Sequence, residues 1–307
     1  MEKDFHFYLI YAVSKITGFE KSDIIAFSSQ FVDDNNEGQF SIDDRPALFP
    51  EKIGANGGHY YPIMTQSLSP KSMNPYVQKY VYVPFHFVPG DNSVVIDGKK
   101  NPLSTTPGSS NAGAVLKKAI ESDNPYLLGI ALHTYADTWS HQNFTGLQEG
   151  WNAVYPWYNV FKSIVPNIGH AEAGHSPDVI SEEWTDHRLG KTINNAKRAF
   201  TATGEIYKAM RRKSGIGPYW TDIRKDFKKI INAAGYVDRK NKIEDLLTES
   251  GLGALPKYDK NEWIDAALDR KGDEIVMHEG FEKTHWYRFN QAAKIQFATV
   301  LELTKEL

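Results

Sequence analysis

The chain has 307 residues, of which 41% are hydrophobic and 24% are charged. These values are ordinary for globular proteins and exclude a disordered chain, a collagen-like repeat and a simple coiled coil. The formal net charge of −3 indicates no basic surface for double-stranded nucleic acid, and the absence of cysteine excludes disulfides and thiolate chemistry. No apolar run approaches the roughly 20 residues that span a bilayer. We therefore expect no transmembrane segment and a cytoplasmic protein, while secretion through a removed presequence stays open.

Helical patterns dominate the chain. In chain order, they predict helices over residues 6–18, 23–32, 112–121, 126–141, 151–164, 185–212 and 284–306. The pattern over 185–212 is a continuous apolar stripe at steps of three and four residues. Residues 35–111 differ because they are rich in glycine, proline, asparagine and serine, with strand-like pieces at 80–83 and 93–96. An irregular stretch of this length is usually functional, so we expect these loops to lie over a site.

These patterns predict an all-α fold, a multi-helix bundle with long irregular loops and a small helical C-terminal lobe. We expect a metal-binding helical core over residues 1–213, which includes the loop region 35–111. Residues 214–283 are predicted to form the appended lobe, because glycines interrupt them into shorter helices. The last helix, within residues 284–307, is expected to pack back on the core.

The most informative segment runs from His133 to His141. His133, Asp137 and His141 are spaced four residues apart, so their side chains share one face of a helix. The preceding turns are apolar, which indicates that this helix is largely buried. Burying two imidazoles and a carboxylate along one stripe is costly unless something pairs them. Because both groups are ligands of first-row metals, the segment predicts a metal site.

The stretch Gly169–Asp178 contains four further possible ligands, His170, Glu172, His175 and Asp178. Small residues separate them, so the backbone could approach an ion closely. The alternative is a polar loop in which Asp178 serves as a helix cap.

Candidate ligands also lie nearer the N-terminus. His6 begins the first predicted helix among aromatic residues, an unusual place for an unpaired imidazole. Asp33 and Asp34 end the second helix, where the helix dipole favours a cation, and a helix-stop turn is the alternative. His59 follows two glycines and is a similar candidate. His86 lies between two phenylalanines and could equally pack, contact substrate or bind metal.

The segment Gly129–His141 resembles the central metal-binding helix of the zinc-dependent phospholipase C and single-strand nuclease superfamily, whose members are all-α. The likeness extends to a histidine in the first helix, an aspartate after the second, and a late histidine with a nearby glutamate, here matched by His6, Asp33, His170 and Glu172. Three shorter phrases look closer still to an uncharacterised bacterial branch of that superfamily, at residues 29–35, 84–90 and 169–174. The resemblance covers about residues 5–210.

This resemblance implies a cluster of two zinc ions, with a place for a third. The first ion would be bound by Asp33 or Asp34 together with His59, His133 and Asp137. The second ion would be bound by His141 and His170 together with Glu172 or His175. The place for a third ion would lie between His6 and Asp137.

The resemblance also implies a hydrolase of phosphoester bonds, in which a hydroxide shared by two ions attacks phosphorus. Asp137, as the bridging ligand, and Asp33 would be the catalytic carboxylates. The substrate would be a small phosphoester, with a lipid head group as one candidate. This reaction needs no protein nucleophile, in agreement with the absence of cysteine.

Two other interpretations stay open. Metals could join helices without catalysing anything, which closed coordination would indicate, whereas an open coordination position indicates catalysis. A metal-free interaction module is the other possibility, but it leaves the polar face from His133 to His141 unexplained. The sequence does not determine the oligomeric state.

Overall fold

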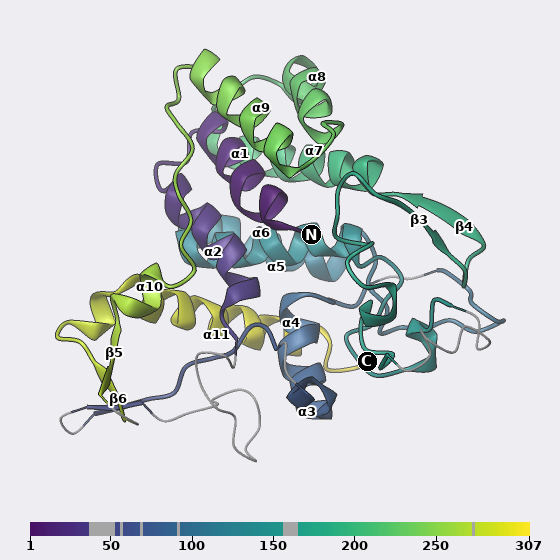
Figure 1. Cartoon of the computed structure of the whole chain (residues 1–307), viewed down its shortest axis with the longest axis horizontal. Helices are drawn as coiled ribbons and strands as arrows, with labels where there is room; N and C mark the ends of the chain where they lie inside the picture. The colour runs from purple at the N-terminus through teal and green to yellow at the C-terminus, as the bar shows by residue number, and fades with distance from the viewer. Residues whose placement is uncertain (37–52, 56–57, 68–69, 91–92, 156–164, 272–273) are drawn as a thin grey trace.

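Helix α6 (Pro125–Ser140) runs through the centre of the computed structural model (Figure 1). Pro125 presets the backbone at the first helical position, and the side chain of Asn124 accepts hydrogen bonds from the N–H groups of Tyr126 and Leu127 at 3.0 and 3.2 Å. The helix is buried on nearly every side. The structure describes residues 1–307 except for 37–52, 56–57, 68–69, 91–92, 156–164 and 272–273.

Four long helices pack directly against α6 and share its hydrophobic core. They are α2 (Ser22–Asp34), α5 (Ser110–Glu121), α7 (Asn195–Ser214) and α11 (His285–Leu303). The N-terminal segment forms the π-helical turn η1 (Asp4–Leu9) and continues as α1 (Ile10–Ile16), which packs on α2.

Short helical turns lead from the loop region to the centre of the molecule. They are η2 (Pro70–Met73), α3 (Pro75–Val77), the π-helical turn η3 (Gln78–Tyr82) and α4 (Val83–Phe85), and two further turns follow α6, η4 (Gly150–Asn152) and η5 (Ala171–Ala173). Thr134 on α6 donates a hydrogen bond to the carbonyl oxygen of Phe85 at 2.8 Å, and Gln296 on α11 donates to that of Pro84 at 3.1 Å. These two bonds hold α4 against α6, so they also place His86, the next residue of the chain.

Residues 214–283 contain α8 (Trp220–Ile231), α9 (Tyr236–Glu249), α10 (Glu262–Asp265) and the turn η6 (Phe281–Lys283). Buried side chains of these helices, among them Phe227, Ile243 and Trp263, belong to the same hydrophobic core as α6. In Figure 1, α8 and α9 lie at one end of the molecule, beside α1 and α7. The segment predicted as an appended lobe therefore shares its core with the other described residues.

The prediction of an all-α fold is wrong, because the described residues include three two-stranded antiparallel sheets. They are β1–β2 (Ile53–Ala55 and Gly58–Tyr60), β3–β4 (Glu183–Asp186 and Lys191–Asn194) and β5–β6 (Leu268–Lys271 and Glu274–Met277). The fold is dominated by helices but has mixed content, and the C-terminal region predicted as purely helical includes the β5–β6 hairpin. The sequence pattern does not reveal these hairpins, because an apolar pattern over so few residues suits a strand and a helix equally.

Three local predictions also need correction. The helix predicted over 185–212 begins only at Asn195, because residues before it form the β3–β4 hairpin, whose turn includes Gly190 at φ +59°. Residues 80–83, predicted as strand-like, are helical and lie in η3 and α4, and residues 93–96 form only an isolated bridge at their end.

Most of the helix predicted over 151–164 falls outside the described residues.

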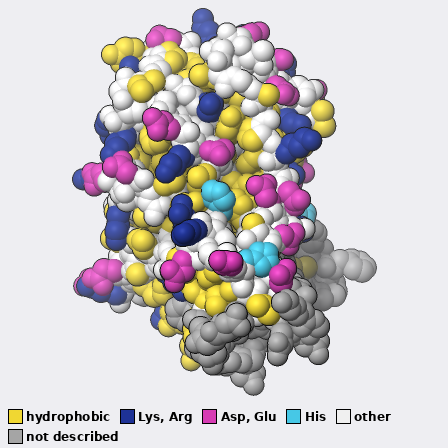
Figure 2. Space-filling view, turned by 90° about the vertical axis from the view of Figure 1, so that its left-hand side faces the viewer, with side chains coloured by type: hydrophobic (Ala, Val, Ile, Leu, Met, Phe, Trp, Pro, Cys, Tyr) yellow, Lys and Arg dark blue, Asp and Glu magenta, His cyan; other side chains and the backbone are white. Residues whose placement is uncertain are grey.

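Within the described residues, no helix is both long and apolar enough to cross a bilayer. Figure 2 shows basic and acidic side chains intermixed over one face of the molecule. This agrees with the small net charge of −3, and that face carries no extended patch of a single sign.

Gly129 provides a test of the close contact between α6 and α2. A Cβ atom at this position would lie 2.3 Å from the carbonyl oxygen of Ile25 and 2.5 Å from the Cβ of Ser28. Gly129→Ala should therefore lower the free energy of unfolding by about 1–3 kcal/mol in urea denaturation. Gly113→Ala in α5 is the matched control, since its Cβ would meet nothing within 4 Å. The control should raise stability by about 0.5–1 kcal/mol, and equal effects of the two substitutions would contradict the contact.

Candidate metal centre

The carboxylate of Asp137 is 1% exposed and lies among four histidines. Its Oδ1 atom is 3.1 Å from Nε2 of His6. Its Oδ2 atom is 3.1 Å from Nδ1 of His86, 3.1 Å from Nε2 of His133 and 3.7 Å from Nδ1 of His141. Both oxygens of one buried carboxylate therefore face imidazole nitrogens, as expected of a ligand that bridges two cations.

Asp33, His86 and His133 form a first group, whose ligand atoms lie within 4.8 Å of one another. Oδ1 of Asp33 is 3.7 Å from Nε2 of His133 and 3.9 Å from Nδ1 of His86. In each of the two histidines, the ring nitrogen that points away from Asp33, called the outer nitrogen here, contacts a backbone carbonyl oxygen. Nε2 of His86 lies 2.9 Å from the carbonyl oxygen of Thr65, and Nδ1 of His133 lies 2.8 Å from that of Ser29. Because a carbonyl oxygen only accepts, these outer nitrogens carry protons. The inner nitrogens, 3.2 Å apart, then both present lone pairs.

His141, His170 and Asp178 form a second group. Nε2 of His141 lies 3.0 Å from Oδ1 of Asp178, and Nε2 of His170 lies 3.3 Å from Oδ2. Here too the outer nitrogens donate to backbone carbonyl oxygens. Nδ1 of His141 donates to the carbonyl oxygen of His86 at 3.0 Å, and Nδ1 of His170 donates to that of Gly174 at 2.9 Å. Gly174 has φ +62°, so the chain can turn there between His170 and Asp178.

His6, His133 and Asp137 form a third group beside η1. The rings of His6 and His133 stack with their centroids 3.9 Å apart. Nδ1 of His6 is buried and has no hydrogen-bond partner among the described residues. The amino nitrogen of Met1 lies 2.7 Å from Oδ1 of Asp137 and 3.2 Å from Oδ1 of Asp178, so it places a positive charge between two carboxylates.

This donor set fits divalent metal ions better than it fits a network of hydrogen bonds. Four imidazoles each use one N–H on a backbone carbonyl and direct the other nitrogen at a further acceptor. Two groups that both present lone pairs form no hydrogen bond with each other unless one of them is protonated. A metal ion, in contrast, can bind the lone pairs of both groups. A histidine whose outer N–H binds a carbonyl is the usual arrangement around a protein-bound metal. Nitrogen and oxygen donors without thiolates suit zinc and other first-row ions.

Neighbouring charges keep two of the carboxylates ionised. Burial alone would raise the pKa of Asp137, but the facing His141 and the amino group of Met1 hold it well below its usual range. Burial also opposes ionisation of Asp178, yet the Met1 amino group and the facing histidines hold the pKa of this carboxyl well below its usual range. Burial would lower the pKa of the Met1 amino group, but the carboxylates outweigh it and raise this pKa to about 11.

Burial has the dominant effect on other members of the cluster. It raises the pKa of Asp33 to about 6, opposed by His133 and reinforced by the Asp137 carboxylate. It lowers the pKa of His170 to about 4 and that of His6 well below the usual value. Near pH 7 these two histidines are therefore neutral and Asp33 is ionised, which are the forms that bind metals.

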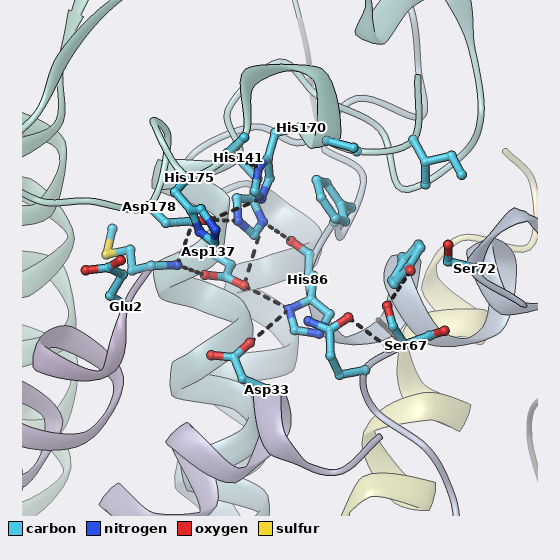
Figure 3. Close-up of a pocket in the computed structure, with 18 of the residues that line it drawn as sticks. Glu2, Asp33, Ser67, Ser72, His86, Asp137, His141, His170, His175 and Asp178 are labelled. Atoms are coloured by element: carbon cyan, nitrogen blue, oxygen red, sulfur yellow. Dashed lines mark hydrogen bonds and ion pairs between the residues drawn. The ribbon is translucent and has the colours of Figure 1, made fainter. Parts of the chain in front are cut away.

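A pocket of about 910 Å³ opens over the cluster (Figure 3). Members of the three groups that line it are Asp33, His86, Asp137, His141, His170 and Asp178. His6 and His133 do not line it and are fully buried. Other parts of its wall come from Glu2, Ser67, Tyr82, Phe87 and Tyr236. Its volume is in the range of small-molecule sites.

The structure brings most of the predicted ligands together but places two of them elsewhere. Asp34 accepts hydrogen bonds from the hydroxyl of Tyr258 at 2.7 Å and the amide of Gln30 at 3.3 Å. Asp34 lines the pocket beside Asp33 but belongs to none of the ligand groups found among the described residues. Glu172 is buried on η5 and accepts from the backbone N–H groups of Val154 and Tyr155 instead.

Two further predicted ligands lie outside the three groups. His175 is exposed and lines the pocket, but it belongs to none of the ligand groups found among the described residues. The backbone of His59 lies in β2, and its side chain is outside the described part of the structure.

Sequence reasoning does not assign His86 and Asp178 to the cluster, and it gives no sign of the contact between the Met1 amino group and Asp137. It leaves His86 with three equal possibilities, although its place among buried aromatic residues is a signal. It counts Asp178 among the possible ligands of the stretch Gly169–Asp178, with a helix cap as the alternative, but does not assign it to an ion. The proximity of the Met1 amino group to Asp137 has no local signal, since it depends on how η1 packs on α6.

Comparison with known proteins adds the family of the chain. Residues 1–304 match a family described as a family of unknown function, DUF6765. The chain belongs to the DUF6765 family. No curated protein and no solved structure matches it. The family match includes every residue of the metal-ligand groups, and the geometry of the cluster is what indicates the chemistry of this DUF6765 protein.

The raised pKa of Asp33 predicts how the stability of the metal-free protein depends on pH. The folded state holds the Asp33 proton between about pH 4 and 6 whereas the unfolded state has lost it, so the contribution of Asp33 to stability falls as pH rises through this range. In the presence of a chelator, Asp33→Asn should therefore raise the free energy of unfolding by on the order of 1–3 kcal/mol above about pH 6 and change it little below about pH 4. Denaturant titrations across this pH range measure the difference.

With zinc present, the same substitution should lower stability instead, because a ligand is lost. Asp34→Asn is the control, since Asp34 lies outside the ligand groups, and it should not show this reversal. An Asp33→Asn effect of the same sign with and without zinc would contradict the assignment.

Proposed function

We propose that this protein is a metal-dependent hydrolase of phosphoester bonds, with zinc as the metal. The observation that carries the proposal is the carboxylate of Asp137, whose two oxygens face separate histidines at the floor of an open pocket. A carboxylate shared by adjacent ions is typical of hydrolases that use two metals.

The proposed ligand set differs from the one that the sequence predicted. Asp33, His86 and His133 would hold one ion with Asp137, so His86 takes the place assigned to His59. His141, His170 and Asp178 would hold a second ion, so Asp178 takes the place assigned to Glu172 or His175. His6 and Asp137 offer a place for a third, since Nε2 of His133 has a single lone pair and can bind only one ion at a time.

Bound zinc would lower the pKa of water toward neutrality and polarise a phosphoryl oxygen. The residues of the chain would contribute orientation and charge. The backbone carbonyls of Ser29 and Thr65 hold the rings of His133 and His86, and burial keeps the imidazole of His170 neutral. Asp137 stays ionised throughout the physiological pH range because of its cationic and histidine neighbours.

Differences in exposure around the cluster favour a catalytic role over a purely structural one. Asp33, His170 and Asp178 are 29%, 20% and 15% exposed, whereas His6 and His133 are fully buried. Structural zinc sites are closed by protein, whereas catalytic sites keep an open position for water or substrate. One side of this cluster is enclosed and the other side meets the pocket, as substrate access requires.

The resemblance of the segment Gly129–His141 to the zinc-dependent phospholipase C and single-strand nuclease superfamily supports the same reaction class. A small phosphoester is the proposed substrate, with a lipid head group as one candidate. A cytoplasmic location stays a prediction.

The first test of the proposal is the metal content of the protein. Elemental analysis of protein purified without chelators or a metal-affinity tag should find about two to three equivalents of zinc or another first-row metal per chain. Fewer than about 0.2 equivalents, not restored by added zinc, would contradict the proposal and favour the metal-free interpretation.

The second test is Asp137→Asn, which removes the charge of the shared ligand at nearly constant volume. We expect it to lower the rate of bis(4-nitrophenyl) phosphate hydrolysis by at least about 100-fold and to reduce the metal content, since even outer-shell changes at metal sites cost 10–100-fold. Glu172→Gln is the matched control, because Glu172 is also buried and its hydrogen bonds within the described part of the chain come from backbone N–H groups. It should keep its metals, and full metal content in Asp137→Asn would refute the bridging role.

A further inference from the structure

Arg239 in helix α9 forms a buried ion pair with Asp4, the first residue of η1. Nε of Arg239 lies 2.5 Å from Oδ2 of Asp4, and the two side chains are 2% and 0% exposed. Nη1 of Arg239 also donates to the carbonyl oxygen of Ala233 at 3.0 Å, so the guanidinium group is held in place within its own helical region. The ion pair therefore ties the N-terminal segment to α9, which is far from it in the sequence.

Asp4 lies on the turn η1, which also carries His6 of the third ligand group. The carbonyl oxygen of Glu2 accepts hydrogen bonds from the backbone N–H groups of Phe5 at 2.9 Å and His6 at 3.1 Å. Residues from Glu2 to His6 are thereby joined in one hydrogen-bonded turn at the start of the π-helical turn η1. Such π-helical turns are rare and occur frequently at functional sites. A displacement of Asp4 would shift the imidazole of His6 relative to Asp137.

Arg239 neutralises the buried negative charge of the Asp4 carboxylate. Its second oxygen, Oδ1, is buried and has no hydrogen-bond partner among the described residues. Removal of the guanidinium would leave a buried, uncompensated negative charge, which is strongly unfavourable. The turn would then relax to bring this carboxylate toward water.

We propose that Arg239 is a positioning residue for the metal group formed by His6, His133 and Asp137. Acting through Asp4, it holds η1 so that Nε2 of His6 faces Oδ1 of Asp137. This inference rests on the proposed metal-dependent function and extends it to α9, from which no residue belongs to the ligand groups of the described chain. It assigns to part of the region 214–283 a role in the metal centre.

The test compares zinc binding by the full chain with and without the ion pair. Each protein is stripped with a chelator, titrated with zinc alone in equilibrium dialysis, and analysed for bound zinc per chain. Arg239→Met should bind one equivalent fewer, or bind one equivalent at least about tenfold more weakly, while the remaining equivalents bind as in the wild type. Arg239→Lys keeps the positive charge and should recover part of the lost binding.

Ile243→Ala is the control for a general loosening of α9. Ile243 is fully buried on the same helix, so its truncation lowers stability while both charged side chains of the ion pair remain. It should keep the full complement of zinc at wild-type affinity, even where its melting temperature falls as far as that of Arg239→Met.

Asp4→Asn provides a second route if Arg239→Met does not fold. It keeps the size of the side chain, removes the charge, and should produce the same loss of one equivalent. Wild-type zinc binding in Asp4→Asn or Arg239→Met, or the same loss in Ile243→Ala, would overturn the positioning role. Absence of zinc binding in the wild-type chain would be a different result, because it defeats the proposed function itself.

Discussion

A buried negative charge is the constraint on which this structure depends. The carboxylate of Asp137 lies in the last turn of α6, a helix that is buried at the centre of the core. Such a group is tolerated only where cations or hydrogen-bond donors compensate it. Every element that reaches it supplies such a group: His6 from η1, His86 from the end of α4, and His133 and His141 from α6 itself. The arrangement of helices around α6 is thus also the arrangement of candidate ligands around one carboxylate.

The irregular loops orient the histidines of the cluster. Helices use their own carbonyl groups internally, so free acceptors for imidazole N–H groups come mainly from non-helical backbone. Thr65, His86 and Gly174 each provide such a carbonyl oxygen, and none of them lies within a helix. A ring held at its outer nitrogen can present only the inner nitrogen to an ion. The loops between the helices are therefore as important to the proposed metal chemistry as the helices that carry the ligands.

The cluster is enclosed on one side and open on the other, and this asymmetry connects the fold to the proposed reaction. The enclosed side lies against η1, which the buried pair of Asp4 and Arg239 anchors to α9. The open side lies beneath the pocket, where Asp33 and His170 remain partly exposed. Because the buried ligands His6 and His133 are held by the core, the partly exposed ligands Asp33 and His170 can contact a substrate while the cluster keeps its geometry. This combination of an enclosed and an open side supports the proposed metal-dependent hydrolase function.

Local spacing alone is sufficient to predict the central ligands. Residues four apart in a helix share a face whatever surrounds the helix, so the sequence by itself groups His133, Asp137 and His141. The short hairpins are not predictable in this way, because three or four residues of apolar pattern suit either kind of element. The choice between Asp33 and Asp34, and the recruitment of His86 and Asp178, depend on how α2, α4 and the turn at Gly174 pack against α6. Those contacts join residues far apart in the chain, so only the tertiary structure decided which side chains complete the cluster.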